Sequence, residues 1–148
     1  MANRIVDRPK QHITSPYGKR KLFSKFHKGI DLRTYDDNFK ERLEILLPCE
    51  CIYLRSVYQK KWGFTHVFSP TSGIADEIKF THITKIDFTV EKVYSAGTFL
   101  GKSCLTKYMI KKGYGEHLHF ETWKKNEKEK LKHFNPIKFL EYLEIEYD

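Results

Sequence analysis

The sequence has 148 residues, with 27 Lys and Arg against 19 Asp and Glu, a formal net charge of +8, and 15% aromatic residues. These values exclude a disordered acidic chain, which would lack the aromatic residues, and a disulfide-built miniprotein, which would need more than three Cys. We expect one globular domain over residues 1–148, because a chain of this length buries roughly 68–70% of the surface that its unfolded form exposes. The charge indicates an anionic partner, for which nucleic acid, a membrane surface and the bacterial wall are candidates.

Charge and cysteine are unevenly placed along the chain. Residues 1–28 carry eight Lys and Arg against the single Asp7, whereas residues 139–148 carry four acids and no base. The N-terminal basic residues precede no apolar stretch, and no run approaches the length of a membrane span, so we expect synthesis in the cytoplasm without a signal peptide or transmembrane segment. Cys49 and Cys51 lie too close along one strand for easy bridging, and we expect reduced, structural thiols.

Strand-like segments dominate the middle of the chain. Residues 36–47 have weak helical character, and later segments rich in β-branched and aromatic residues are bounded by Gly, Pro, Ser or Asp. We predict strands at 44–58 with a break at Pro48, at 62–68, at 77–84, at 86–94 and at 117–123. The charged run 124–132 is expected to be a solvated connection, and Asn135-Pro136 predicts the start of a C-terminal helix. The expected fold class is mostly β, an antiparallel sheet or sandwich with a short C-terminal helix.

The chain contains seven His, and two of them share the predicted strand at 117–123. The period of two places His117, His119 and Glu121 on one face of that strand and Leu118 and Phe120 on the other. The two imidazoles would then project together from the face opposite the core. Two ordinary surface histidines would have the same spacing.

His27 and Asp31 form a second candidate pair. Four extended residues would separate them by about 13 Å, too far for one metal ion, but Gly29 permits a bend. Imidazole and carboxylate are suitable Zn²⁺ ligands, and a third His would leave the open position that a catalytic site needs. A surface His near a turn Asp is the alternative. His82 shares a strand face with Phe80, which is also the pattern of a buried structural histidine.

The order of these segments is more specific than any one of them. The chain contains Ile13 to Arg20, His27 to Asp31 (H-K-G-I-D), Leu47 to Ile52, Phe80 to Ile86, Ala96 to Gly101, His117 to Glu121 (H-L-H-F-E) and Asn135 to Leu140. In this order they resemble the lysostaphin-like, LytM-type zinc endopeptidases, which have the duplicated hybrid motif fold and cut peptides of bacterial peptidoglycan. The resemblance covers about residues 12–142.

The resemblance implies a zinc ion held by His27, Asp31 and His119, with His82 and His117 beside it as catalytic histidines that are not ligands. Three protein ligands leave one position for water or for the scissile carbonyl. A neutral imidazole can accept the proton of that water, and an N–H group can stabilise the oxyanion; either histidine could take either part. Three histidines match no motif position and are expected to be structural or at the surface: His12, His66 and His133.

Two segments depart from the family pattern. Residues 102–112 stand where relatives have a short Gly/Ser/Thr-rich loop that should border the substrate groove, so the identity of the cut bond is not carried over. Residues 62–69 replace a strand rich in Val and Gly. Trp62 and Phe64 are expected in the core, with a place in the groove wall as the alternative.

Three functions from different classes follow from the sequence. The first is a zinc metalloendopeptidase that hydrolyses a stem or cross-bridge peptide of peptidoglycan. The alternative is a noncatalytic domain on the same fold that binds the wall or a partner, and the presence of all five site residues argues against it. A nucleic-acid binder has only the charge and the aromatic residues in its favour, and without a recognised signature we expect no nucleic-acid partner.

The expected route to the wall follows from the expected absence of a signal peptide. Such a hydrolase must be released or delivered by other means, which suggests a bacteriophage lysis enzyme or virion component. The expected partners are the peptidoglycan peptide and, in the second case, phage tail or baseplate proteins. The basic segment 1–28 ends beside His27, where a positive rim would attract an anionic wall.

Overall fold

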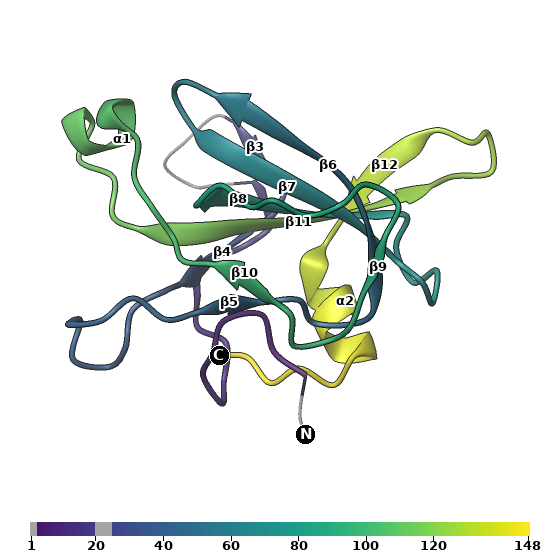
Figure 1. Cartoon of the computed structure of the whole chain (residues 1–148), viewed down its shortest axis with the longest axis horizontal. Coiled ribbons are helices and arrows are strands. Elements are labelled where there is room, and N and C mark those ends of the chain that lie inside the picture. Colours follow the sequence, from purple (N-terminus) through teal and green to yellow (C-terminus); the bar gives the residue numbers. More distant parts are fainter. Residues whose placement is uncertain (1–2, 20–24) are drawn as a thin grey trace.

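Antiparallel strands account for most of the fold (Figure 1). The computed structural model describes residues 3–19 and 25–148. In these residues the strands are β1 (Ile13–Ser15), β2 (Gly18–Lys19), β3 (Phe26–His27), β4 (Ile30–Arg33), β5 (Ile45–Leu46), β6 (Cys51–Gln59), β7 (Gly63–Pro70), β8 (Glu77–Ile83), β9 (Val93–Tyr94), β10 (Phe99–Gly101), β11 (His117–Lys125) and β12 (Leu131–Phe134). The helices are α1 (Lys107–Lys111) and α2 (Pro136–Tyr142). The predicted mostly β, antiparallel fold with a short C-terminal helix is confirmed.

The largest sheet has the strand order β1-β4-β11-β8-β7-β6-β9, and β12 also pairs with β11. All of its pairs are antiparallel. β5 and β10 form a separate two-stranded sheet, as do β2 and β3. In Figure 1, α2 and the β5–β10 sheet lie below the large sheet, so one of its faces is covered and the other is open.

Alternation along the strands gives the large sheet an apolar face and a polar face. On the apolar face the rings of Phe80 and Phe120 have centroids 5.2 Å apart, and the ring of Phe139 in α2 lies 5.6 Å from that of Phe120. The same buried cluster includes Ile30, Leu32, Ile45, Ile78, Leu100, Leu118 and Leu140. Each such side chain contributes about 1.5–3 kcal/mol on burial, so this face is held inward and the alternate residues face outward.

The weak helical character of residues 36–47 does not produce a helix. The backbone there makes a turn, in which Phe39 N–H donates to Asp36 O (3.0 Å) and Lys40 N–H donates to the Asp36 carboxylate (2.8 Å). The Asp36 carboxylate thus accepts hydrogen bonds from nearby backbone N–H groups and competes with helix formation. The segment then becomes extended, because Leu46 N–H donates to Ile5 O at 2.6 Å and β5 pairs with β10.

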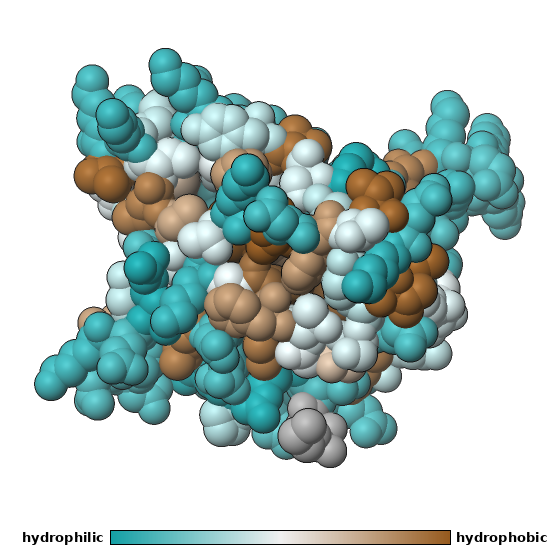
Figure 2. Space-filling model, in the orientation of Figure 1, coloured by the Kyte–Doolittle hydropathy of each residue, from teal (hydrophilic) through white to brown (hydrophobic). Residues whose placement is uncertain are grey.

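The C-terminal helix begins as predicted. Asn135 is the N-cap, its side chain accepts a hydrogen bond from Ile137 N–H at 3.0 Å, and Pro136 follows in the first turn. The charged residues 124–132, expected to be a solvated connection, lie partly in strands. β11 extends to Lys125, β12 begins at Leu131, and the two strands pair as a hairpin. That hairpin projects at the right of Figure 1, and Figure 2 shows hydrophilic side chains along it.

The strand predicted at 86–94 is present only as Val93–Tyr94. It pairs with two residues of β6, Cys51 and Ile52, and the preceding residues turn instead of extending. In that turn Lys92 N–H donates to Thr89 O at 3.2 Å, and Glu91 has a φ of 66°. The segment therefore crosses the edge of the sheet and contributes little to it.

Part of the basic N-terminal segment lies outside the described residues, because Arg20 and Lys21 fall within 20–24. The thiols of Cys49, Cys51 and Cys104 are all free. No helix in the described part of the chain is long and apolar enough to cross a membrane.

Replacing Gly29 by Ala should destabilise the fold by about 2 kcal/mol or more, because an added Cβ would overlap the backbone carbonyl oxygen of Phe120. Gly29 thus allows β11 to approach closely, in addition to the bend expected between His27 and Asp31. Gly115→Ala is the matched control, since no atom lies within 4 Å of its added Cβ. Urea unfolding of both variants tests this, and equal stabilities would contradict it.

Candidate metal centre

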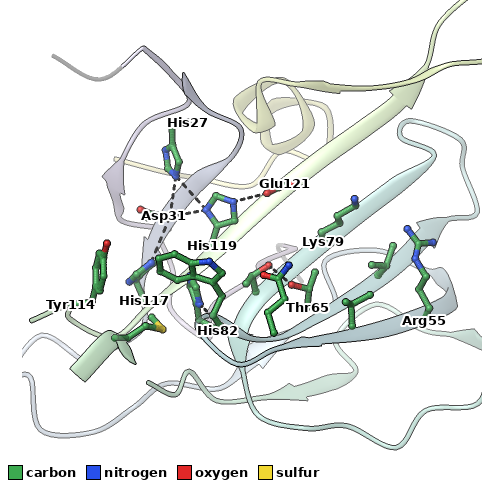
Figure 3. Close-up of a pocket in the computed structure, with 16 residues that line it drawn as sticks. His27, Asp31, Arg55, Thr65, Lys79, His82, Tyr114, His117, His119 and Glu121 are labelled. Atoms are coloured by element: carbon green, nitrogen blue, oxygen red, sulfur yellow. Dashed lines mark hydrogen bonds and ion pairs between the residues drawn. The ribbon is translucent and has the colours of Figure 1, made fainter. Parts of the chain in front are cut away.

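A groove of about 520 Å³ runs across the polar face of the large sheet (Figure 3). Its floor consists of two rows of residues that are register partners on neighbouring strands. The first row is Asp31, His119, Thr81, Thr65 and Val57, and the second is Glu121, Lys79, Val67 and Arg55. Because paired strands lie about 4.8 Å apart, the register brings side chains from distant segments into contact.

Three side chains that could bind a metal ion meet at one end of this groove. His119 Nδ1 lies 3.0 Å from Asp31 Oδ1, and His27 Nε2 lies 3.2 Å from His119 Nδ1 and 3.3 Å from Asp31 Oδ1. Asp31 and His119 are register partners on β4 and β11, and the turn at Lys28 and Gly29 returns His27 to them. The structure therefore brings together the three residues that the resemblance implied as ligands.

The spacing of these donor atoms fits a zinc ion. Ligand atoms about 2.0–2.2 Å from zinc at tetrahedral angles lie roughly 3.3–3.6 Å from one another, within a few tenths of an ångström of the three separations here. Two imidazoles and one carboxylate are also a donor set that zinc accepts with its fourth position open. His27, Asp31 and His119 are thus suited to hold zinc.

Hydrogen bonds outside the cluster orient both imidazoles. His27 Nδ1–H donates to Pro16 O at 2.8 Å, which leaves Nε2 directed at the cluster. His119 Nε2–H donates to the Glu121 carboxylate at 2.7 Å, and Trp123 Nε1–H donates to the other oxygen of Glu121 at 2.7 Å. Glu121 was not predicted as a site residue, although its place on the same strand face as His119 was a signal for it. Carboxylates in this position fix the ring orientation of a metal ligand.

Burial disfavours charge in this cluster, but the contacts between its members outweigh burial. Burial lowers the pKa of His119, while hydrogen bonds with Asp31 and Glu121 raise it more, to about 9. Burial raises the pKa of Asp31 and Glu121, while the neighbouring histidines lower both, that of Glu121 to about 2 and that of Asp31 well below its ordinary value. Both carboxyl groups are therefore ionised at neutral pH and favour a cation.

His82 reaches the groove through a β-bulge. Thr65 is opposite Thr81 and Phe64 is opposite Ile83, so His82 is an extra residue in β8, and its φ is 74°. Regular alternation would direct it to the core with Phe80, but the bulge re-aims it into the groove. Its Nδ1–H donates to Trp62 O at 2.8 Å, and burial lowers its pKa to about 4.

His117 lies beside His82 and near the cluster. Its ring centroid is 4.8 Å from that of His82, and its Nε2 is 3.8 Å from Asp31 Oδ1. Its Nδ1–H donates to Gly115 O at 2.8 Å. Figure 3 shows all five predicted side chains around one end of the groove, with Tyr114 next to His117.

The two aromatic residues considered as groove walls have different positions. Trp62 lines the groove, and its ring centroid is 6.1 Å from that of His82. Phe64 does not line it and stacks on His66 at a centroid distance of 5.7 Å. The segment expected to border the groove contains α1, from which Met109 reaches the lining.

The remaining histidines make contacts away from the cluster. His66 is fully buried and hydrogen-bonds to Ser56 Oγ (2.6 Å) and Thr84 O (2.8 Å). His12 pairs with Asp148 at 2.8 Å, and His133 pairs with Tyr17 Oη at 2.8 Å. Their expected structural or surface positions agree with these contacts.

The strand arrangement matches solved peptidase structures. The NMR solution structure of lysostaphin aligns with a TM-score of 0.69 at 18% identity, over 93% of this chain and 52% of lysostaphin. The catalytic domain of the antimicrobial peptidase lysostaphin from Staphylococcus simulans gives 0.61 at 17% identity, over 87% of this chain and 91% of that domain. The chain has the lysostaphin-like, LytM-type fold. It spans about half the length of the longer lysostaphin chains.

The LytM-type fold is also shared by proteins described in other terms. A mutant catalytic domain of the prophage-encoded protein EnpA from Enterococcus faecalis aligns with a TM-score of 0.62 at 19% identity, over 92% of this chain and 95% of that domain. The complex of SpoIIIAH and SpoIIQ gives 0.64 at 15% identity, over 91% of this chain and 96% of the matched chain. No protein-family model matches, and the search of curated proteins found no similar sequence. These similarities define the fold, and any argument about activity depends on the site residues.

At position 82, Gly should be more stable than Ala by about 1 kcal/mol, because a positive φ strains every residue that has a Cβ. Thermal unfolding of His82→Gly and His82→Ala measures the difference. The same pair of substitutions at Thr81, which has no positive φ, should give the opposite order. The bulge interpretation fails if Ala is the more stable at both positions.

Glu121→Gln should weaken zinc binding by about tenfold or more, because it removes the charge that His119 Nε2–H contacts. Competition with a chelator measures the zinc dissociation constant. Glu127→Gln, at an exposed position in the turn between β11 and β12, is the matched control and should bind zinc like the unaltered protein. Equal affinities in both variants would show that Glu121 does not support the metal ligands.

Proposed function

We propose that the chain is a zinc-dependent endopeptidase that hydrolyses a stem or cross-bridge peptide bond in bacterial peptidoglycan. One observation carries the proposal: at the end of the groove, the donor atoms of His27, Asp31 and His119 have the spacing of a zinc site. Two further histidines lie beside them. The fold adds support, since lysostaphin is described as an antimicrobial peptidase and another similar structure is a zinc-containing peptidase from Vibrio cholerae.

The ligand residues and the two other histidines have separate parts in this proposal. His27, Asp31 and His119 would hold zinc, which when bound lowers the pKa of a water molecule and polarises the scissile carbonyl. His82 and His117 each donate Nδ1–H to a backbone carbonyl, so each has Nε2 available at the groove. One Nε2 accepts the proton of the attacking water, and the other, when protonated, donates to the oxyanion.

The open groove provides for binding and orientation. Beyond the candidate ligands, the first row of its floor consists of Thr81, Thr65 and Val57, which are all β-branched side chains. A peptide can therefore lie along the sheet with its backbone close to the strands, while longer side chains project away from the floor. Such positioning lowers the barrier by holding the scissile bond beside the histidines.

A noncatalytic domain that binds the wall or a partner is the second candidate. It is favoured by the similarity to the SpoIIIAH–SpoIIQ structures, one of which is described as a pore forming complex. The intact set of ligand and neighbouring histidines favours the enzyme instead. Zinc binding without peptide hydrolysis would favour the second candidate.

The biological setting rests on the sequence and stays a prediction. We propose a bacteriophage origin, as a lysis enzyme or as a virion component bound to tail or baseplate proteins. Among the similar structures, EnpA is described as prophage-encoded. The single peptidase domain over residues 1–148 is part of the same proposal.

The function is tested by separating zinc content from hydrolysis. His119→Ala should lose both, because it removes a ligand, whereas His82→Ala and His117→Ala should keep zinc and lose roughly 10²–10⁴-fold in rate. Mass analysis of fragments from digested peptidoglycan measures the rate and identifies the bond cut, and elemental analysis measures zinc. His12→Ala, which alters a histidine paired with Asp148, is the control and should behave like the unaltered protein.

Unchanged hydrolysis in His119→Ala would overturn the enzyme assignment. The absence of stoichiometric zinc from the unaltered, active protein would overturn the metal assignment.

A further inference from the structure

Two segments that lack acidic residues carry exposed lysines beside the groove. Residues 57–65 contain the turn between β6 and β7, residues 102–115 contain α1, and neither segment has an Asp, Glu or Arg. The exposed lysines of the turn and of the helix with its C-cap form what we call the lysine patch: Lys60, Lys61, Lys107, Lys111 and Lys112. This patch is distinct from the basic segment at residues 1–28.

Direct contacts hold the two segments together. Thr106 Oγ1 donates to Lys61 O at 2.5 Å, and the rings of Trp62 and Tyr108 pack edge to face with centroids 5.4 Å apart. Lys61 Nζ lies 5.1 Å from the centre of the Tyr108 ring, and Met109 is fully buried. The lysines of the turn and of α1 therefore belong to one surface.

Carboxylates do not compensate this surface. None of the ion pairs found among residues 3–19 and 25–148 includes a lysine of the patch. Lys107 and Lys111 are one helical turn apart, where like charges repel, and α1 has no acidic residue in its first turn. Figure 2 shows hydrophilic side chains projecting over α1 and the β6–β7 turn at the upper left. An anionic partner would relieve this repulsion.

The lysine patch adjoins the groove on the side of His82 and His117. Trp62, which lies between the patch lysines and the groove, accepts the His82 Nδ1–H at its carbonyl, and its side chain lines the groove. Met109 of α1 and Tyr114 also line it, and Figure 3 shows Tyr114 next to His117. A polymer bound to the patch would therefore lie alongside a peptide in the groove.

We propose that the lysine patch binds a phosphodiester-linked polymer of the bacterial wall and so holds the peptide of that wall beside the groove. The choice of a wall polymer rests on the proposed function. Lysine ammonium groups are flexible point charges that bind phosphates spaced along a chain, and neither segment has the Arg fork that would pair bidentately with a single carboxylate or phosphate group. Nucleic acid also carries phosphodiesters; the proposed function favours the wall polymer, and titration with DNA separates the two.

Two triple variants with the same change of charge test the patch. Lys107→Gln/Lys111→Gln/Lys112→Gln removes three patch charges, and Lys125→Gln/Lys128→Gln/Lys130→Gln removes three exposed charges from the β11–β12 hairpin at the other end of the molecule (Figure 1). Binding is measured by co-sedimentation with purified walls and by titration with poly(glycerol phosphate), each at low and high salt. Walls stripped of phosphodiester polymer by hydrofluoric acid form the second arm. Zinc content and thermal unfolding report whether both variants are folded.

The patch variant should bind intact walls and poly(glycerol phosphate) about tenfold more weakly at low salt, with a smaller loss on adding salt, and the hairpin variant should bind within about twofold of the unaltered protein. Stripping the walls should abolish the difference. Equal losses in both variants, a difference that persists on stripped walls, or tighter binding to DNA than to poly(glycerol phosphate) would each overturn the proposal. Hydrolysis of a soluble peptide by the unaltered protein tests the proposed function separately, because that substrate carries no polymer.

Discussion

The register between β4, β11 and β8 is the constraint on which the site depends. It places Asp31 opposite His119 and His119 opposite Thr81, so a carboxylate and an imidazole from segments 88 residues apart meet at 3.0 Å. A slip of one residue in β11 would turn His119 into the core and expose Phe120, because side chains alternate between the faces. The packing of Phe120 against Phe80 and Phe139 opposes that slip. The apolar face thus fixes the register that brings the candidate metal ligands together.

The site also requires that regular pairing be broken at one point. Regular alternation along β8 would turn the His82 side chain into the core. Its contacts with Trp62 and His117 instead place it in the groove. The bulge in β8 resolves this by adding one residue with a positive φ, which costs of order 1–3 kcal/mol. Hydrogen bonds on the far side hold the distortion: Cys104 N–H donates to His82 O, and Ile83 bridges to Ser103. Strain of this kind is expected where a side chain must be aimed at a reaction centre.

Charge is arranged differently in the groove and on the surface beside it. At the candidate metal site, Asp31 and Glu121 have lowered pKa values and supply negative charge beside the imidazoles. At the β6–β7 turn and α1, lysines gather without carboxylates. One arrangement favours a metal cation, and the other favours an anionic polymer outside the groove. The net charge of +8 therefore combines a negatively charged cluster in the groove with positively charged surface segments, and the two attract different partners.

The sequence by itself determined the fold class and the C-terminal helix, and its resemblance to the LytM-type family indicated the five candidate site residues. Alternating apolar residues and the Asn135-Pro136 cap are local signals that folding preserves, whereas the order of the His segments carried the resemblance. Local signals failed at residues 36–47, where the Asp36 side chain competes with the helix and pairing with Ile5 decides the conformation. Only the tertiary structure decided the donor spacing of the metal centre, the bulge that re-aims His82, the support of His119 by Glu121 and the union of two lysine segments. Each of these features depends on contacts between residues distant in sequence or on one irregular backbone position. Such contacts and irregular positions produce no periodic pattern in the sequence.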